Sequence, residues 1–365
     1  MNLVLGWYFH LPPCCTEAEF DTCADGSLAL LIAAHERHRA PAVVAITGHL
    51  LSQIERRRPA LLTPLRGLIT GGTLELAATT YYEIAPHLVP PSHFSAQLEA
   101  DLEIKQRLFG ALPSTFWPGN FGWSPMMGRT LGRHGIRTLL LDEPHLRSTT
   151  RTQLWKWLRG PEIGPRSYLV DTGCSETDVT RPYALDQADD ATLTLLFRST
   201  TMHRRFSFGV EGCIHQPWDD AATDSLLASL AQSAAQGRTE ALFLGDDGDR
   251  INAVSIHQYE RVLDACTGRL RLASCAWQVA PADRMEFLCA HASAGIIERN
   301  DPGNQAYLAV LAELYTHVAA GRIEMADTLP LHDVFPLFWT RISRSRWFYD
   351  RAQELLDQAH QARRR

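Results

Sequence analysis

The sequence predicts a parallel α/β barrel of seven or eight strands followed by a helical C-terminal domain. Short apolar runs alternate with segments of helical composition over roughly the first 280 residues, a pattern typical of a parallel sheet covered by helices. From Ala282 onward the pattern is helical only. The 365 residues are enough to bury a large core. We therefore expect a barrel domain over residues 1–280 and a helical domain over residues 281–365.

The N-terminal third has the clearest periodicity. The continuous apolar run Leu3–Phe9 predicts a buried first strand, and Gly26–Arg39 predicts a helix with Leu28, Leu31 and His35 near one face. The same criteria predict strands at Ala42–Thr47 and Thr73–Thr79, and helices at His49–Arg57 and Ala60–Thr70, the last of them ended by Gly71 and Gly72.

The later segments continue the alternation. Ser92 is the expected N-cap of a helix over His93–Phe109, and Gly135 is expected to end a helix over Pro125–His134. Further strands are predicted at Thr115–Trp117, Arg137–Leu141, Ser167–Val170, Leu193–Arg198, Ala241–Leu244 and Arg269–Cys275. Further helices are predicted at Asp219–Gln236, Ile256–Ala265, Arg284–Ser293, Asn304–Ala320 and Ser345–Gln361.

Composition argues against several classes of protein. The chain has 35 basic and 41 acidic residues, a net charge of −6 that does not favour nucleic acid or an anionic membrane as partner. The eight cysteines form no C-x-x-C pair or zinc-finger spacing, so we interpret them as reduced thiols. No window approaches about 18 uninterrupted apolar residues, and Met1–Pro13 resembles a strand more than a signal peptide. We expect a cytoplasmic protein without a metal or other cofactor.

Polar and aromatic side chains lie near the ends of the predicted strands. His10 follows the first strand in Y-F-H-L-P, and Glu75 interrupts the third strand in G-G-T-L-E-L. A carboxylate in an apolar strand is costly to bury without a partner. Barrel enzymes keep their chemistry at the carboxyl ends of the strands. Tyr8, His10 and Glu75 are therefore candidate site residues.

The stretch Thr115–Pro125 reads T-F-W-P-G-N-F-G-W-S-P and places Asn120 between Trp117 and Trp123. Its apolar start breaks into Pro-Gly, as a barrel strand does where the following loop begins. The two tryptophans are either packing residues or aromatic surfaces for a ligand.

Three aspartates follow a late strand in G-D-D-G-D. Asp246, Asp247 and Asp249 repel one another unless they are solvated, bind a cation or share a proton. The residues alone leave two interpretations open, an acid/base or cation site and a solvated acidic turn around Gly248.

In combination, these motifs resemble glycoside hydrolase family 57, a group of retaining enzymes that act mainly on α-linked glucans through a (β/α)7 barrel followed by helices. In the first family motif, H-x-H-Q-P, His10 matches the second histidine and Tyr8 replaces the first. The stretch G-G-T-L-E-L-A-A-T-T-Y-Y looks like the second motif and places Glu75 on the family's glutamate. The family's histidine after the two tyrosines is here Glu83.

The third family motif is W-x-x-E or W-x-P-E, and its glutamate is the nucleophile. This chain reads W-P-G-N, so the resemblance places Asn120 at the nucleophile position after Trp117. The fourth motif, D-G-E, is similar to Asp247-Gly248-Asp249, which implies that Asp247 is the general acid. The stretch G-I-R-T-L-L-L-D-E-P-H also fits the family, and the resemblance covers roughly residues 2–260.

The resemblance implies an oligo- or polysaccharide substrate of the α-glucan class. An amide cannot attack an anomeric carbon, and by comparison with loss of a nucleophile in a protease triad the turnover would fall by about 10⁴ to 10⁶. We expect a fold that still binds the sugar, with aromatic platforms at Trp117 and Trp123. The expected catalytic positions are Asp247 and Asn120, and the expected substrate-binding residues are His10, Glu75, Trp117, Trp123, Asp249 and Tyr8.

Three functional hypotheses remain open. The chain is an active hydrolase or transferase that uses another carboxylate, namely Glu143, Asp142 or Asp246, or an inverting path through Asp247. Alternatively, it is a catalytically inactive glucan-binding or regulatory homologue. The third hypothesis is a metal-dependent polysaccharide deacetylase-like hydrolase with His10, Asp246 and Asp247 as ligands. The absence of an H-x-x-x-H spacing after the aspartates argues against it.

Overall fold

The computed structural model describes residues 1–148, 179–186, 192–199, 202, 219–236, 241–266, 271–273, 284–285, 302–333 and 346–364. Its strands within these ranges are β1 Asn2–Phe9, β2 Ala42–Ile46, β3 Leu74–Ala77, β4 Thr115–Phe116, β5 Thr138–Asp142, β6 Tyr183–Asp186, β7 Thr192–Arg198, β8 Ala241–Asp247, β9 Arg271–Leu272 and β10 Arg284–Met285.

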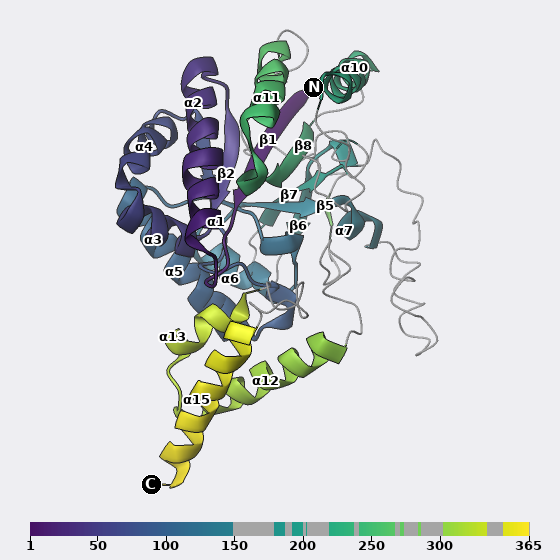
Figure 1. Cartoon of the computed structure of the whole chain (residues 1–365). Helices are drawn as coiled ribbons and strands as arrows, with labels where there is room; N and C mark the ends of the chain where they lie inside the picture. The colour runs from purple at the N-terminus through teal and green to yellow at the C-terminus, as the bar shows by residue number, and fades with distance from the viewer. Residues whose placement is uncertain are drawn as a thin grey trace.

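Seven of these strands form a nearly closed parallel barrel (Figure 1). Their order is β3-β2-β1-β8-β7-β5-β4, and a parallel bridge between Ala78 and Phe116 brings β4 back to β3. β9 pairs with the start of β1, and β6 pairs antiparallel with β7. The expected (β/α)7-type barrel is confirmed.

Helices cover the outside of the barrel and follow the strands in alternation (Figure 1). Among the described residues the barrel helices are α1 Glu17–Asp21, α2 Ala29–His38, α3 Gly48–Arg57, α4 Leu62–Thr70, α5 Pro91–Phe109, α6 Met127–Arg133, α7 Glu143–Ser148, α10 Asp220–Gln236 and α11 Ala253–Ala265. Short 3₁₀ or π turns connect them: η1 Thr22–Leu28, η2 Pro59–Leu61, η3 Pro86–Leu88, η4 Gly119–Phe121 and η7 Gly248–Arg250.

Most predicted elements are confirmed, two details differ, and one predicted strand is not tested. α5 begins at Pro91 after Pro90, so Ser92 is inside the helix and is not its N-cap. Proline suits the first helical position because its φ is already helical and it has no N–H that needs a partner. The helix predicted over Arg284–Ser293 is wrong at its start, where β10 pairs parallel with β6. The strand predicted at Ser167–Val170 lies outside the described residues.

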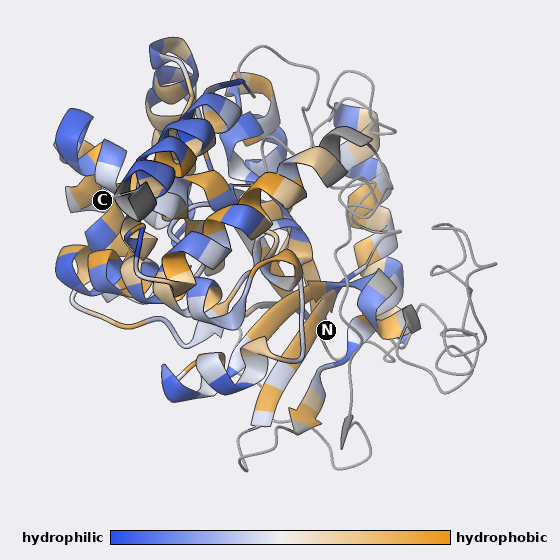
Figure 2. Ribbon diagram, turned by 90° about the horizontal axis from the view of Figure 1, so that it is seen from below, coloured by the Kyte–Doolittle hydropathy of each residue, from blue (hydrophilic) through white to orange (hydrophobic). Residues whose placement is uncertain are grey.

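The strands of the barrel have two apolar faces, which explains their continuous hydrophobic runs. In β1, Leu3, Leu5 and Trp7 pack outward against the helices, whereas Val4 and Tyr8 point into the barrel. Figure 2 shows the strands mainly in the hydrophobic colour and the helices with hydrophilic residues on their outer faces. The period of two in strand side chains produces this separation.

Trp117 fills the centre of the barrel. It follows β4, is only 2% exposed and packs against Phe243 with ring centroids 5.1 Å apart. A Cβ added to Gly6 would lie 2.6 Å from this indole, and a Cβ added to Gly245 would lie 2.4 Å from it. Real Cβ atoms do not approach so closely, so these two positions in β1 and β8 require glycine while the indole occupies the interior.

The described C-terminal residues form helices that pack at the lower end of the barrel (Figure 1). They are α12 Pro302–Ala319, α13 Met325–Thr328, η9 Leu329–His332 and α15 Arg346–Arg364. α12 and α15 share an apolar cluster that includes Tyr307, Leu314 and Phe348. Gln97 of α5 donates a hydrogen bond to the Leu329 carbonyl at 2.8 Å, which ties the helices to the barrel.

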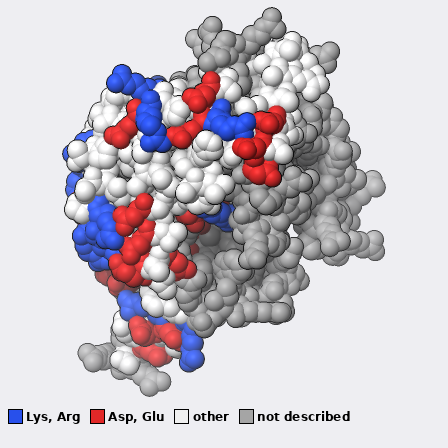
Figure 3. All heavy atoms as spheres, turned by 45° about the horizontal axis from the view of Figure 1, so that its top comes forward, with Lys and Arg blue, Asp and Glu red and all other residues white. Residues whose placement is uncertain are grey.

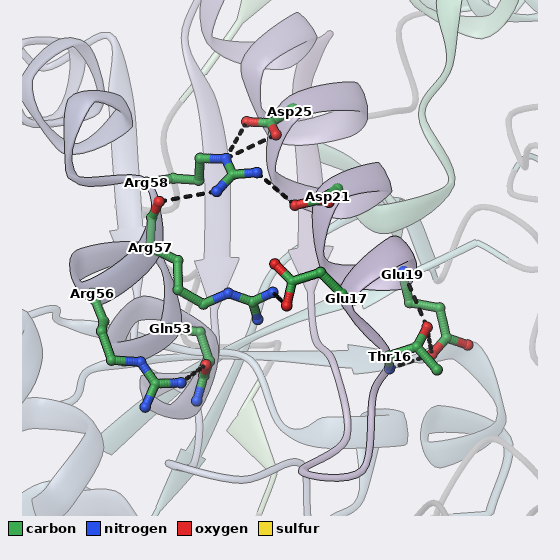
Figure 4. A network of polar contacts seen from close by, with 9 residues as sticks. All are labelled: Thr16, Glu17, Glu19, Asp21, Asp25, Gln53, Arg56, Arg57 and Arg58. Carbon is green, nitrogen blue, oxygen red and sulfur yellow. Dashed lines mark hydrogen bonds and ion pairs between the residues drawn. The ribbon is translucent and has the colours of Figure 1, made fainter.

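Charges on the described surface are mixed in sign. Arg58 pairs with Asp21 and Asp25, and Arg57 pairs with Glu17 (Figure 4). Arg57 also lies over the Phe20 ring, 3.6 Å from its centroid. On the face that Figure 3 presents, basic and acidic side chains are interspersed. No helix in the described part of the chain is long and apolar enough to cross a membrane.

A buried ion pair connects α5 to the end of β3. Lys105 and Asp101 are both fully buried, their Nζ and Oδ2 atoms are 2.7 Å apart, and Lys105 also donates to the Ala77 carbonyl at 2.9 Å. Asp101 accepts hydrogen bonds from the backbone and hydroxyl of Thr79 at 2.9 and 3.1 Å. The pair therefore holds the chain as it leaves β3 toward the barrel mouth.

Lys105→Met should lower the free energy of unfolding by about 3–5 kcal/mol, because it leaves Asp101 as a buried charge without its partner. Denaturant titration measures the change. The matched control is Arg107→Met on the same helix, whose exposed ion pair with Glu55 should contribute less than about 1 kcal/mol. The double variant Lys105→Met/Asp101→Asn should recover stability relative to Lys105→Met; equal losses in Lys105→Met and Arg107→Met would contradict the role of the buried pair.

Candidate active site

Five segments bring polar side chains to the carboxyl end of the barrel. We call the residues His10, Glu83, Asn120, Asp247 and Asp333 the mouth cluster. His10 follows β1, Glu83 lies in the loop after β3, Asn120 lies in η4 after β4, Asp247 ends β8, and Asp333 follows η9. Parallel strands place these ends at one side of the barrel, the position of the active site in enzymes with such barrels.

Glu83 is the centre of the mouth cluster. Its Oε2 lies 3.2 Å from Nε2 of His10, and its Oε1 accepts a hydrogen bond from the Asn120 amide at 3.3 Å. Burial raises the pKa of Glu83 well above its usual value, and the charges of Asp333 and Asp247 raise it further. Glu83 therefore favours its protonated form, which can donate a proton.

His10 is held neutral. Burial lowers its pKa to about 3, and the nearby His49 contributes to the shift. Its Nε2 is 3.7 Å from Oδ2 of the fully buried Asp333. The distances from His10 to Glu83 and Asp333 are short enough for ion pairs. Burial, however, opposes charge on both His10 and Glu83, so their contact is a neutral hydrogen bond between a carboxylic acid and an imidazole.

The loop that carries Asn120 has an unusual backbone. Asn120 and Phe121 have φ angles of 51° and 52°, in the left-handed region that asparagine tolerates better than most residues. His145 of α7 donates a hydrogen bond from Nε2 to the Phe121 carbonyl at 2.7 Å and is fully buried. This contact stabilises the strained turn.

Gly119 permits the contact between Asn120 and Glu83. A Cβ at Gly119 would lie 2.6 Å from Cγ of Glu83 and 2.9 Å from the carbonyl oxygen of Ile84. The two loops therefore approach backbone to backbone, and a larger residue would force them apart. The loops that carry W-P-G-N and Y-Y-E therefore pack directly against each other at the barrel mouth.

The end of β8 carries two inequivalent aspartates. Asp247 is level with Tyr8 on the barrel-facing side, its side chain is 46% exposed, and it forms a 3.0 Å ion pair with Arg250. Burial raises the pKa of Asp249 to about 7, and the charge of Asp247 raises it as well. Asp246 is level with Trp7, which packs outward. Asp246 and Asp247 therefore point to opposite faces of the strand, and the metal site expected from His10, Asp246 and Asp247 does not converge.

The alternative carboxylate Asp142 already has a partner in a partly buried arginine. Arg198 of β7 binds both of its oxygens at 3.1 Å, and the same guanidinium lies 4.3 Å above the Phe121 ring. Glu143 is 3% exposed and its backbone N–H donates to Asp142. The pair of Arg198 and Asp142 thus packs beneath η4. Because both oxygens of Asp142 are bound by Arg198, the structure does not favour Asp142 as a nucleophile.

Neither tryptophan offers an open ring face. Trp117 fills the barrel, and Trp123 is 1% exposed within the apolar cluster that includes Phe94 and Phe116. The expectation of aromatic platforms at these positions is wrong, because both rings are buried in the core. The half-buried aromatic residue next to Glu83 is Tyr82, whose ring centroid lies 4.8 Å from that of His49.

Glu75 and Tyr8 lie deeper than the mouth cluster. Glu75 accepts a hydrogen bond from the Thr115 hydroxyl and is level with Gly6, two residues below Tyr8 on the barrel-facing side. Tyr8 is 5% exposed and packs against Trp117 with ring centroids 5.6 Å apart. The Glu75 contact links the neighbouring strands β3 and β4, whereas the Tyr8 contact crosses the barrel interior. A substrate-binding role for either residue stays a prediction.

Sequence reasoning missed Glu83 and Asp333 as site residues. Glu83 was visible only as a departure from the histidine that follows the two tyrosines in the family motif. The signal that could have found it is that this departure occurs together with asparagine at position 120. Asp333 had no such signal, because its position depends on how η9 packs against α5.

Comparisons with known proteins show the family and the fold of the chain. The family model described as glycosyl hydrolase family 57 matches residues 17–263. A 4-α-glucanotransferase from Thermococcus litoralis is 30% identical over 105 residues, and an α-amylase from Pyrococcus horikoshii is 29% identical over 105 residues. Each match covers 29% of this chain but only 16% of the relative, so the curated relatives are much longer than the matched segment.

Solved structures show the same fold. A branching enzyme of this family from Thermococcus kodakaraensis superimposes with a TM-score of 0.67 at 11% identity, over 98% of this chain and 88% of that chain. The Thermococcus litoralis 4-α-glucanotransferase superimposes with a TM-score of 0.61 at 18% identity, over 88% of this chain and 45% of that chain. Since the family model spans more than half of the sequence, the chain belongs to glycosyl hydrolase family 57.

Proposed function

We propose that the chain is a glycoside hydrolase or transglycosidase of α-glucans in which Glu83 supplies a carboxyl group that Asn120 lacks. The observation that carries the proposal is the contact of Glu83 with Asn120 and His10 at the barrel mouth. Family membership and relatives named as a glucanotransferase and an amylase support the substrate class. A cytoplasmic location is part of the same proposal.

The two carboxyl groups have unlike surroundings, which is how glycosidases divide their roles. Glu83 is mostly buried near other carboxylates and favours the protonated form, whereas Asp247 is 46% exposed and paired with Arg250. Glu83 then donates its proton to the leaving oxygen as the glycosidic bond breaks. Asp247 attacks the anomeric carbon or activates water, a role opposite to the one implied by the family motif.

The stereochemistry of the product distinguishes the two paths open to Asp247. Carboxyl groups about 5–5.5 Å apart act with retention through a covalent intermediate, and groups about 6.5–9.5 Å apart leave room for water and act with inversion. Proton NMR of the first product anomer therefore reports which path Asp247 follows.

The second candidate function is non-catalytic glucan binding. Asn120 favours it, because an amide at the family's nucleophile position cannot form a glycosyl ester. Both functions require that a maltooligosaccharide binds at the mouth cluster. Turnover separates them.

Glu83→Gln should lower the release of reducing ends and transfer products from maltooligosaccharides by about 10²–10⁴-fold, the usual contribution of a general acid. Asp247→Asn should lower it at least as much. Glu99→Gln makes the same chemical change at an exposed side chain of α5 and should leave the rate unchanged. The assays use purified full-length protein, with Tm measured for each variant.

Two further variants test the exchange of side chains between positions 83 and 120. Asn120→Glu alone should not raise the rate, because it places a second carboxyl group against Glu83. Asn120→Glu/Glu83→His recreates the family pattern and should be active. Equal rates in wild type and Glu83→Gln would overturn the catalytic role of Glu83; sugar binding without turnover in the wild type would establish the non-catalytic function.

The contribution of Asp249 to stability should fall as the pH rises from about 4 to about 7. The pKa of Asp249 is raised to about 7 in the folded chain, so folding takes up a proton in this range and deprotonation opposes folding. The slope contributed by this group is at most about 1.4 kcal/mol per pH unit. Denaturant titrations of the wild type and of Asp249→Asn at several pH values measure it, because Asp249→Asn should remove this downward contribution and make the slope between pH 4 and 7 more positive than in the wild type.

The control for this pH dependence is Asp327→Asn, which changes an exposed carboxylate in the C-terminal helices. It should leave the slope between pH 4 and 7 as in the wild type. A profile that Asp249→Asn does not alter would show that Asp249 keeps an ordinary pKa.

A further inference from the structure

The C-terminal helices carry a group of potential metal ligands far from the barrel mouth in sequence. Glu313 and His317 of α12 and His360 of α15 each offer one ligand atom, and these atoms all lie within 4.8 Å of one another. Nothing in the family motifs involves these residues.

Helix geometry explains the arrangement. Glu313 and His317 are four residues apart, so their side chains share one face of α12. The apolar cluster between α12 and α15 presses the helices together and brings His360 to that face. The imidazole rings of His317 and His360 have centroids 5.1 Å apart, and Nε2 of His360 is 3.6 Å from Oε1 of Glu313.

We propose that Glu313, His317 and His360 bind a divalent transition-metal ion, with Zn²⁺ as the best match. Two imidazoles and one carboxylate are ligands that Zn²⁺ accepts, at metal–ligand distances of about 2.0–2.2 Å. The side chains of Glu313 and His360 are about half exposed and can move inward by the small distance required. His317 is 6% exposed and fixes one edge of the site.

Arg322 competes with the metal in this conformation. Its Nε donates a hydrogen bond to Nδ1 of His317 at 2.9 Å, which fixes that nitrogen as an acceptor. A metal-bound imidazole normally carries a proton on its second nitrogen and donates it. Binding therefore requires Arg322 to turn away, and its positive charge opposes the cation.

The consequence of binding is a cross-link between α12 and α15. The two helices are separated in sequence by residues 320–345 and are otherwise joined by apolar packing. A ligand that binds only the folded arrangement stabilises it by mass action. Zn²⁺ should therefore raise the Tm of the full-length protein.

The test is isothermal titration of ZnCl₂ into tag-free, chelator-stripped full-length protein, together with Tm measurements. The wild type should bind one Zn²⁺ that is lost or weakened at least about tenfold in His360→Ala. Arg322→Met should bind at least as tightly as the wild type. In both the wild type and Arg322→Met, Zn²⁺ should raise Tm by more than it does in His360→Ala.

The matched control is His134→Ala. His134 and Glu99 have the same 3.6 Å separation as His360 and Glu313, and the proposal does not use either of them. This variant should titrate as the wild type does. Identical Zn²⁺ titrations of wild type and His360→Ala would overturn the proposal, and so would weaker binding by Arg322→Met than by the wild type.

Discussion

The indole of Trp117, packed against Gly6 and Gly245 inside the barrel, is the constraint on which the mouth of the barrel depends. It follows the end of β4, and after Pro118 the chain forms η4, Gly119–Phe121, with Asn120 at positive φ. Since Gly119 has no Cβ, this turn can press directly on Glu83. The packing of Trp117 in the core therefore also determines where the candidate catalytic groups lie.

The mouth cluster lowers the folding stability of the chain. Several carboxyl groups lie close to one imidazole, and burial, with repulsion between the carboxylates added to it, raises the pKa of Glu83 in this cluster and of the nearby Asp249. Such an arrangement costs folding free energy at neutral pH, which active sites tolerate because chemistry requires perturbed groups. The buried pair of Lys105 and Asp101, by contrast, compensates its charges within the scaffold below this loop.

The sequence predicted the barrel well because buried parallel strands such as β1 and β5 are continuous apolar runs that need no tertiary information. It could not show that Trp117 and Trp123 are buried, because a tryptophan at the end of a strand or in the loop after it can pack in the core or bind a sugar. β10 is two residues long and exists only through its pairing with β6. Glu83 became a site residue only when its contact with Asn120 was visible.

The most direct test of the account is a crystal structure of Glu83→Gln with bound maltoheptaose. Glutamine keeps the size of the side chain and removes the acid, so the sugar should remain intact. The account predicts that a glycosidic oxygen lies within hydrogen-bond distance of the side chain at position 83, with Asp247 facing the adjacent anomeric carbon. A sugar bound elsewhere, or bound here with position 83 away from every glycosidic oxygen, would contradict it.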